Sequence, residues 1–259
     1  MNARLNRLFG ADGKCLDVAV DHGLFGEPSF RAGIENPRRA IATLVAAAPD
    51  AIQLSAGIAP LLQELPGSKP ALVLRTDVAN IYGPEPCRPF FSELTADAVG
   101  QAVRLDAACV CVNLLDVPNE LELRRQCIHN ISVLRAACDV AAVPLMVEPL
   151  VMKPGAGGYG VDGDIDRVVT LVRQAVELGA DVIKADPTDD LGDYPRVVEA
   201  AAGRPVLVRG GGRASDDEIL ERSRRVMAAG ASGLVYGRNV IQHEDPSGMV
   251  QRLMAIVHG

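Results

Sequence analysis

One lysine of this sequence stands where its amine is expected to act as a nucleophile. Lys184 lies in the segment VIKAD, and the apolar residues before it predict a buried strand. A lysine is rarely buried unless it is paired or functional. Loss of hydration disfavours the ammonium form, and the neutral amine can attack a carbonyl carbon to give an imine. The structural alternatives are an ion pair with Asp186, two residues away on the same strand face, or a side chain that extends out of the mouth of the barrel into water.

Two glycine-rich segments predict an anion-binding site. One reads RGGGR and follows the apolar run that ends at Val208, and the other reads GRN and follows the run that ends at Tyr236. Consecutive glycines let backbone N–H groups approach an anion, and the helices that follow add partial positive charge. The alternative is that the glycines serve only tight turns. The residues expected to hold a phosphate are Arg209, Gly210, Gly211, Gly212, Gly237 and Arg238.

Three further side chains are candidates for proton transfer. Asp21 and His22 follow the first apolar run, and Glu148 lies near the end of the fifth. A carboxylate beside an imine-forming lysine can move the protons of the carbinolamine, and a second can handle the hydroxyl group at the bond that breaks. Either carboxylate suits either task. For His22 we favour a hydrogen bond that orients Asp21, with direct catalysis as the alternative.

The elements that position these groups form a repeating pattern. Eight short apolar runs end in polar residues or glycine, and segments with helical periodicity separate them. Such alternation predicts a parallel sheet covered on both faces, and eight units in 259 residues predict a (β/α)₈ TIM barrel. No linker interrupts the pattern, so residues 1–259 are expected to form one domain. The runs are Cys15–Val20, Ala51–Leu54, Ala71–Thr76, Cys109–Leu115, Pro144–Leu150, Val182–Ala185, Pro205–Val208 and Gly233–Tyr236.

Helix-capping residues support the same pattern. Asp164 is expected to cap a helix that Gly179 closes. Ser215 and Glu218 have the spacing of a capping box, and the helix that they begin is expected to end at Gly230.

Two connections after strands are longer than the usual βα loop. They span residues 77–93 and 151–163. Active sites of (β/α)₈ barrels lie at the carboxyl ends of the strands, and phosphate sites lie after strands seven and eight. We therefore expect the two long connections to be lids over the site. The alternative is that they are surface insertions without a role.

Two other patterns resemble cofactor sites but lack the required context. Gly155, Gly157 and Gly160 match the dinucleotide motif GxGxxG, yet they fall within a long connection instead of joining a strand directly to a helix. Asp186 and the pair Asp189 and Asp190 fit turn and helix-start chemistry as well as cation binding. The histidines and cysteines show no zinc spacing. We expect no metal and no other cofactor.

Charge and composition exclude several classes of partner. Lys and Arg total 26 against 33 Asp and Glu, so the net charge is −7, which argues against nucleic acid and anionic lipid. No segment has the length and apolarity of a membrane span or a signal peptide, so we expect a cytoplasmic protein. The six cysteines are thinly spread, which predicts reduced thiols in the core instead of disulfides: Cys15, Cys87, Cys109, Cys111, Cys127 and Cys138.

Four segments resemble a known family over nearly the whole chain. VDHGLFGEPSF, VIKAD, VLVRGGG and LVYGRNVIQ resemble the class I aldolases of the archaeal-type fructose-bisphosphate aldolase and deoxyribose-phosphate aldolase superfamily. LVLRTDVAN and the final GRN also resemble the autoinducer-processing thiolase of that group. DHG near the start together with GRNxxQ near the end is more specific than the lysine alone.

The resemblance implies roles for several of these residues. Lys184 matches the Schiff-base lysine, Asp21 matches an acid/base aspartate, and Gly237 and Arg238 match phosphate-binding residues that act with the backbone after strand seven. Members of the family form homo-oligomers, often pentamer-based rings that stack in pairs as decamers. The resemblance therefore implies a homo-oligomer here.

The chain departs from the fructose-bisphosphate aldolases at two places. Those enzymes have an aromatic pair in strand five, and its second member is a proton-transferring tyrosine, where this chain has Glu148 and Leu150. Strand seven ends in Arg209, where a serine or another small residue is usual. Both departures argue against a sugar bisphosphate substrate and leave the imine chemistry in place.

The leading hypothesis is a metal-independent aldehyde-lyase of carbohydrate metabolism that acts on a phosphorylated keto sugar or a related phosphorylated ketone. Lys184 forms the imine, and Glu148 or Asp21 takes the hydroxyl proton. One alternative is acyl transfer from a phosphorylated diketone, as in the thiolase. The other is a barrel that binds a phosphorylated ligand without catalysis.

Overall fold

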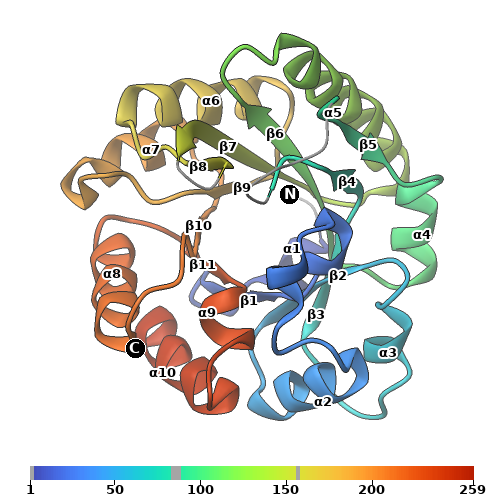
Figure 1. Ribbon diagram of the computed structural model, residues 1–259. Coiled ribbons are helices and arrows are strands. Elements are labelled where there is room, and N and C mark those ends of the chain that lie inside the picture. The colour runs from blue at the N-terminus through green and yellow to red at the C-terminus, as the bar shows by residue number, and fades with distance from the viewer. Residues whose placement is uncertain (1–2, 83–88, 156–157) are drawn as a thin grey trace.

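The computed structural model describes residues 3–82, 89–155 and 158–259, and it confirms the TIM barrel. Eight parallel strands run around the barrel in the order β6-β3-β2-β1-β11-β10-β9-β7, and pairing of β6 with β7 closes it (Figure 1). The eight barrel strands, called staves below, are β1 (Cys15–Ala19), β2 (Ala51–Ser55), β3 (Ala71–Arg75), β6 (Cys109–Asp116), β7 (Leu145–Gly155), β9 (Val182–Ala185), β10 (Val206–Arg209) and β11 (Gly233–Tyr236).

Helices surround the staves, as the alternating sequence pattern predicts (Figure 1). The strands are buried on both faces because these helices cover their outer sides. None of the described helices is long and apolar enough to cross a membrane. The helices are α1 (Leu5–Leu8), α2 (Pro37–Ala47), α3 (Pro60–Gln63), α4 (Ala98–Arg104), α5 (Leu121–Ala141), α6 (Ile165–Glu177), α7 (Tyr194–Ala200), α8 (Asp216–Ala228), α9 (Arg238–Ile241) and α10 (Pro246–His258), with the 3₁₀ helices η1 (His22–Phe25), η2 (Pro28–Arg31) and η3 (Leu191–Asp193).

The expected helix caps are confirmed. The Asp164 side chain accepts a hydrogen bond from the backbone N–H of Arg167 at the start of α6. Ser215 and Glu218 form the reciprocal capping box of α8. Gly179 follows α6 with φ of +94°, a conformation that favours glycine at this position.

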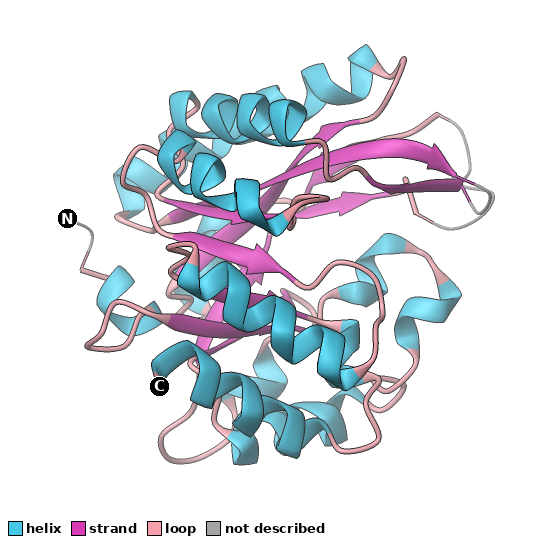
Figure 2. Cartoon of the chain, turned by 90° about the vertical axis from the view of Figure 1, so that its left-hand side faces the viewer, coloured by secondary structure: helices cyan, strands magenta, loops and turns pink. Residues whose placement is uncertain are grey.

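The two long connections contain strands, which the sequence analysis did not predict. β7 continues past the barrel to Gly155 and pairs with β8 (Gly158–Val161) as an antiparallel hairpin, which projects beyond the carboxyl ends of the staves (Figure 2). β4 (Asp77–Ala79) pairs with β5 (Ser92–Leu94) in the other connection. Strand pairing satisfies backbone groups that an open loop would leave to water.

The β7–β8 hairpin contains the described glycines of the GxGxxG motif, and this position tests whether the motif can bind a dinucleotide. Gly155 ends β7, and Gly160 lies in β8 opposite Lys153, whereas Gly157 lies outside the described residues. A dinucleotide site requires the motif at a turn from strand to helix. An antiparallel hairpin does not supply that turn.

The cysteines agree with the expectation of reduced core thiols where the structure describes them. Cys15, Cys109, Cys111, Cys127 and Cys138 are buried and free. The remaining cysteine, at position 87, lies outside the described residues.

Candidate active site

A cavity lies at the carboxyl ends of the staves and brings together residues from distant parts of the sequence. Of the ten predicted site residues, all except Gly212 line it. The predicted residues in its wall are Asp21, His22, Glu148, Lys184, Arg209, Gly210, Gly211, Gly237 and Arg238. The wall also contains residues that the sequence analysis did not select, namely Ala19, Phe25, Phe30, Arg75, Tyr82, Val235 and Asn239.

Lys184 points into the barrel from β9, and its side chain is buried. The Nζ atom lies 3.0 Å from Glu148 Oε2 and donates a hydrogen bond of 3.3 Å to Gln53 Oε1. The alternative of an ion pair with Asp186 is wrong, because Asp186 pairs with Arg209 at 3.1 Å. Glu148 reaches the amine because β7 and β9 are neighbours in the barrel.

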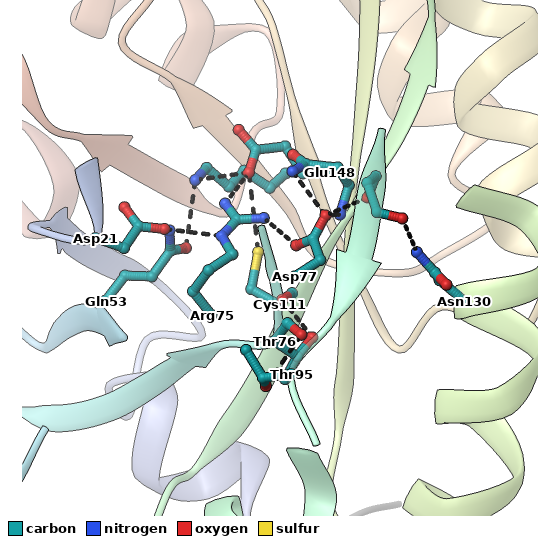
Figure 3. Close-up of polar contacts among 12 residues, drawn as sticks. Asp21, Gln53, Arg75, Thr76, Asp77, Thr95, Cys111, Asn130 and Glu148 are labelled. Carbon is teal, nitrogen blue, oxygen red and sulfur yellow. Dashed lines mark hydrogen bonds and ion pairs between the residues drawn. The ribbon is translucent and has the colours of Figure 1, made fainter. Parts of the chain in front are cut away.

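Arg75 is the centre of the charged network (Figure 3). Its Nε donates to Asp21 Oδ2 at 2.8 Å, and its two terminal nitrogens donate to Asp77 and Glu148. Gln53 adds a hydrogen bond of 2.6 Å to Asp21 Oδ2. An arginine at the end of the apolar run LVLR was a visible signal for this role, since few arginines are buried without carboxylate partners.

The network keeps the two predicted carboxylates ionised. Burial raises the pKa of Glu148, but the charges of Lys184, Arg75 and Arg209 outweigh burial and hold this pKa well below its usual range. Asp21 has a lowered pKa for the same reason, since Arg75 and Lys184 outweigh its burial. At neutral pH both groups are therefore ionised and accept hydrogen bonds.

His22 is buried beside these groups as a neutral imidazole. Burial lowers the pKa of His22 to about 4. The expected hydrogen bond to Asp21 is not formed, since the nearest approach, Nδ1 to Asp21 Oδ1, is 3.9 Å. Instead the ring packs against Gly237, where a Cβ atom would collide with it, and edge-on against Phe30. The close approach of the ring explains why position 237 needs a glycine.

The two glycine-rich segments lie side by side at the mouth. Asn239 joins them, because its Nδ2 donates to the carbonyl oxygens of Gly210 at 3.1 Å and Gly212 at 3.3 Å. Gly211 adopts a φ of +64°, which favours glycine. Backbone groups of both segments thus border one part of the cavity.

The two predicted arginines differ in their partners. Arg209 is engaged, with Asp186 at 3.1 Å and Glu148 at 3.7 Å. Arg238 has no carboxylate partner among the described residues, and its guanidinium lies 4.7 Å from the centre of the Phe30 ring. Burial and the nearby charge of Arg209 lower the pKa of Arg238. An anion beside Arg238 would relieve this unfavourable environment.

Three aromatic rings line the cavity, from η1, η2 and the segment that follows β4. The Tyr82 ring contacts Phe25 at 5.1 Å and Phe30 at 5.4 Å between ring centres. Phe25 also packs against Arg75, whose guanidinium carbon lies 5.6 Å from the ring centre. These rings reduce the access of water to the charged network, which strengthens its electrostatic interactions.

The three aspartates after Lys184 do not form a cation site. Asp186 is buried, whereas Asp189 and Asp190 are exposed, and Asp190 caps η3 by accepting a hydrogen bond from the Gly192 N–H. Within the described ranges, no group of three or more His, Cys, Asp or Glu side chains is arranged to hold a metal ion.

Comparison with known proteins identifies related enzymes. Residues 15–243 match the family model described as DeoC/LacD family aldolase. An uncharacterized aldolase of Saccharolobus solfataricus is 30% identical over 98% of this chain and 93% of its own length. The 2-amino-3,7-dideoxy-D-threo-hept-6-ulosonate synthase of Halobacterium salinarum is 32% identical over 99% and 91%. The 3-hydroxy-5-phosphonooxypentane-2,4-dione thiolase of Salmonella paratyphi A is 32% identical over 100% and 82%.

Two solved structures share the fold at 25% sequence identity. A Schiff base forming fructose-1,6-bisphosphate aldolase superposes with a TM-score of 0.81 and covers 99% of both chains. An archaeal fructose-1,6-bisphosphate aldolase, with its catalytic Lys covalently bound to the carbinolamine intermediate of the substrate, superposes with a TM-score of 0.79 over 100% of this chain and 99% of its own.

Proposed function

The chain belongs to the DeoC/LacD family of aldolases, and from this membership we propose that it is a lysine-dependent carbon–carbon lyase acting on a phosphorylated ketone. One observation carries the proposal: the amine of Lys184 lines a cavity that is also lined by Arg238, which has no carboxylate partner among the described residues. Lys184 supplies the nucleophile, and Arg238 supplies a charge for the phosphate. Their position at the carboxyl ends of the staves is where such barrels carry out catalysis.

In the proposed imine mechanism, the charged side chains of the cavity act in successive steps. The neutral amine of Lys184 attacks the ketone, and loss of water gives an iminium ion whose positive charge Glu148 stabilises. The iminium accepts the electron pair of the breaking carbon–carbon bond. Asp21 or Glu148 receives the proton of the hydroxyl group, because both are ionised at neutral pH. Arg75 holds both carboxylates in place.

The phosphate is proposed to bind between the two glycine-rich segments. Arg238 provides the cation, and the backbone N–H groups of Gly211 and Gly237, which line the cavity, are proposed to provide hydrogen bonds. Arg209 faces the same cavity but is engaged by Asp186 and Glu148, so we place it beside the keto group instead of the phosphate.

Reductive trapping tests this function. Incubation with dihydroxyacetone phosphate and borohydride should add the mass of the reduced adduct to the peptide that contains Lys184. Lys184→Met should abolish labelling and reduce turnover by several orders of magnitude while the protein stays folded. Lys153→Met, in the exposed hairpin, is the matched control and should label normally. Unphosphorylated dihydroxyacetone should label much more slowly, because it lacks the phosphate contact. Labelling of Lys184→Met at the normal rate would disprove the mechanism.

A second candidate is acyl transfer from a phosphorylated diketone. The similarity to the Salmonella paratyphi A thiolase favours it. A turnover rate that depends on coenzyme A would select acyl transfer over aldol cleavage. Under either reaction we propose a homo-oligomer, which light scattering on the purified protein would measure.

A further inference from the structure

Asp77 is a buried carboxylate for which the proposed reaction has no role. It is the first residue of β4, is fully buried, and does not line the cavity. Its Oδ1 accepts a hydrogen bond of 3.3 Å from Nη1 of Arg75. Its Oδ2 accepts bonds of 2.8 Å from the Ser92 hydroxyl and the Asn113 side-chain amide, and a bond of 3.3 Å from the Asn113 backbone N–H. One oxygen therefore contacts the charged network, and the other is held by three donors.

The ribbon formed by β4 and β5 is itself attached to α5. Ser92 lies in β5 opposite Ala79 of β4. Its backbone N–H donates to Gln126 Oε1 at 2.9 Å, and its carbonyl oxygen accepts a bond of 2.8 Å from the buried Asn130 side chain (Figure 3). Gln126 and Asn130 are four residues apart on α5, so they lie on the same face of the helix. The position of the Asp77 carboxylate is thus set by elements outside the cavity.

The hydrogen bond from Arg75 to Asp77 restricts the direction of the whole guanidinium group. This group is planar, and its five N–H donors have fixed relative directions. When Nη1 points to Asp77, Nη2 and Nε are directed to Glu148 and Asp21. Glu148 Oε2 contacts both this guanidinium and Lys184 Nζ, which lies at 3.0 Å. The orientation of Arg75 therefore decides where the carboxylate beside the amine lies.

Resting on the proposed function, we infer that Asp77 is a positioning residue for the imine chemistry. It fixes the guanidinium of Arg75, and Arg75 in turn holds Glu148 beside Lys184, where its charge stabilises the iminium ion. Asp77 acts only through Arg75, without contact to the substrate. The β4–β5 ribbon therefore supports the reaction through Asp77, and the connection of residues 77–93 is more than a surface insertion.

Asp77→Asn tests the inference because it preserves the size of the side chain. The remaining oxygen is expected to keep the three donors, so the new NH₂ group faces Nη1 of Arg75 and two donors oppose each other. With dihydroxyacetone phosphate and cyanoborohydride, the maximal trapping rate at Lys184 should fall about 100-fold per folded molecule. The ketone concentration at half the maximal rate should stay near that of the wild type, because Arg238 and the glycine-rich segments are unchanged. A purely structural residue would change neither value per folded molecule.

Thr95→Val is the matched control, since it also preserves the size of the side chain. It removes a hydrogen bond of 3.2 Å from the Thr95 hydroxyl to the Thr76 carbonyl at the same ribbon, and it leaves the side chains of Arg75 and Asp77 with their partners. The urea midpoint should fall in both variants, while Thr95→Val should trap the ketone at the wild-type rate. Wild-type trapping by Asp77→Asn, or an equal loss in both variants, would overturn the inference.

Ser92→Ala decides the question if Asp77→Asn does not fold. It keeps every charged group of the network and removes one of the three donors to Asp77 Oδ2, so the trapping rate should fall several-fold. A wild-type rate in folded Ser92→Ala would then overturn the inference. Absence of trapping in the wild type would instead reject the proposed function, on which the inference rests, whereas trapping that these variants leave intact rejects the inference alone.

Discussion

The two ends of the barrel interior are built from the same strands but have opposite chemistry. Towards the amino ends the interior is apolar, and α1 closes it with Leu8. Towards the carboxyl ends it is crowded with buried charges around Arg75. Four staves contain both kinds of residue two positions apart, in the pairs Val73 and Arg75, Met146 and Glu148, Val182 and Lys184, and Leu207 and Arg209. The difference teaches that one end stabilises the barrel and the other positions chemical groups.

The charged end is tolerated because its members neutralise one another. A buried ion loses several kcal/mol of hydration, and this loss is offset only by close partners. Arg75 serves three carboxylates, and Glu148 faces three cations. Each charged group therefore stabilises the others in the buried network. An apolar residue at the other end contributes to stability mainly through the burial of its own side chain.

Removal of Arg75 should have the largest effect and should affect both stability and chemistry. Arg75→Met leaves Asp21, Asp77 and Glu148 without their shared cation, so we expect a loss of about 3–5 kcal/mol in the free energy of unfolding. Trapping at Lys184 should also fall sharply, because the carboxylates lose their positions. Urea unfolding and the trapping rate measure the two effects.

An exposed ion pair provides the control for Arg75. Arg104 pairs with Asp97 at 2.9 Å, and both side chains are 63% exposed, so Arg104→Met should change stability by less than about 1 kcal/mol. Equal losses in the two variants would show that the buried network is no more cooperative than a surface pair.

A truncation at the apolar end should separate stability from chemistry. Leu207→Ala removes a fully buried side chain from the apolar end of the barrel interior. This truncation should lower the free energy of unfolding by about 3 kcal/mol. The trapping rate per folded molecule should stay near that of the wild type, because the charged network is intact. A folded Leu207→Ala protein that fails to trap the ketone would contradict the division between the two ends.

The smallest expected effect on stability comes from His258. This residue attaches α10 to the outer surface of the barrel near its apolar end. His258 of α10 bridges Asp12 at 2.8 Å and Asp50 at 2.9 Å. Burial lowers the pKa of His258, but the hydrogen bonds to Asp50 and Asp12 outweigh burial, so the net shift is upward. A raised pKa in the folded state stabilises the protein at low pH, where the imidazole is charged.

The pH dependence of stability checks this bridge. His258→Gln should lose about 1 kcal/mol relative to the wild type near pH 6, below the ordinary pKa of about 6.5. The difference should shrink as pH rises through the raised pKa of the folded state, because the wild-type histidine then becomes neutral. Urea midpoints measured across this range provide the test. A difference that grows with pH would refute the assignment of the charge to His258.

Much of the fold and part of the site could be predicted from the sequence. Apolar runs and capping residues such as Asp164 and Ser215 predicted the staves and the starts of α6 and α8, because both signals are local. Lys184 stood out because a charged residue interrupts an apolar run. Gln53 and Asp17 interrupt apolar runs in the same way. The sequence pattern could therefore have identified both as buried polar residues before the structure did.

The pattern of residue types along the chain determined the barrel, the end at which the candidate site lies, and the presence of a buried amine near glycine-rich segments. Tertiary structure alone decided which groups are partners. Asp186 is two residues from Lys184, yet the amine pairs with Glu148 from a neighbouring stave, while Arg75 joins carboxylates from three segments. The physical reason is that strand register and barrel closure set the distances across the interior, and spacing along one strand does not contain them.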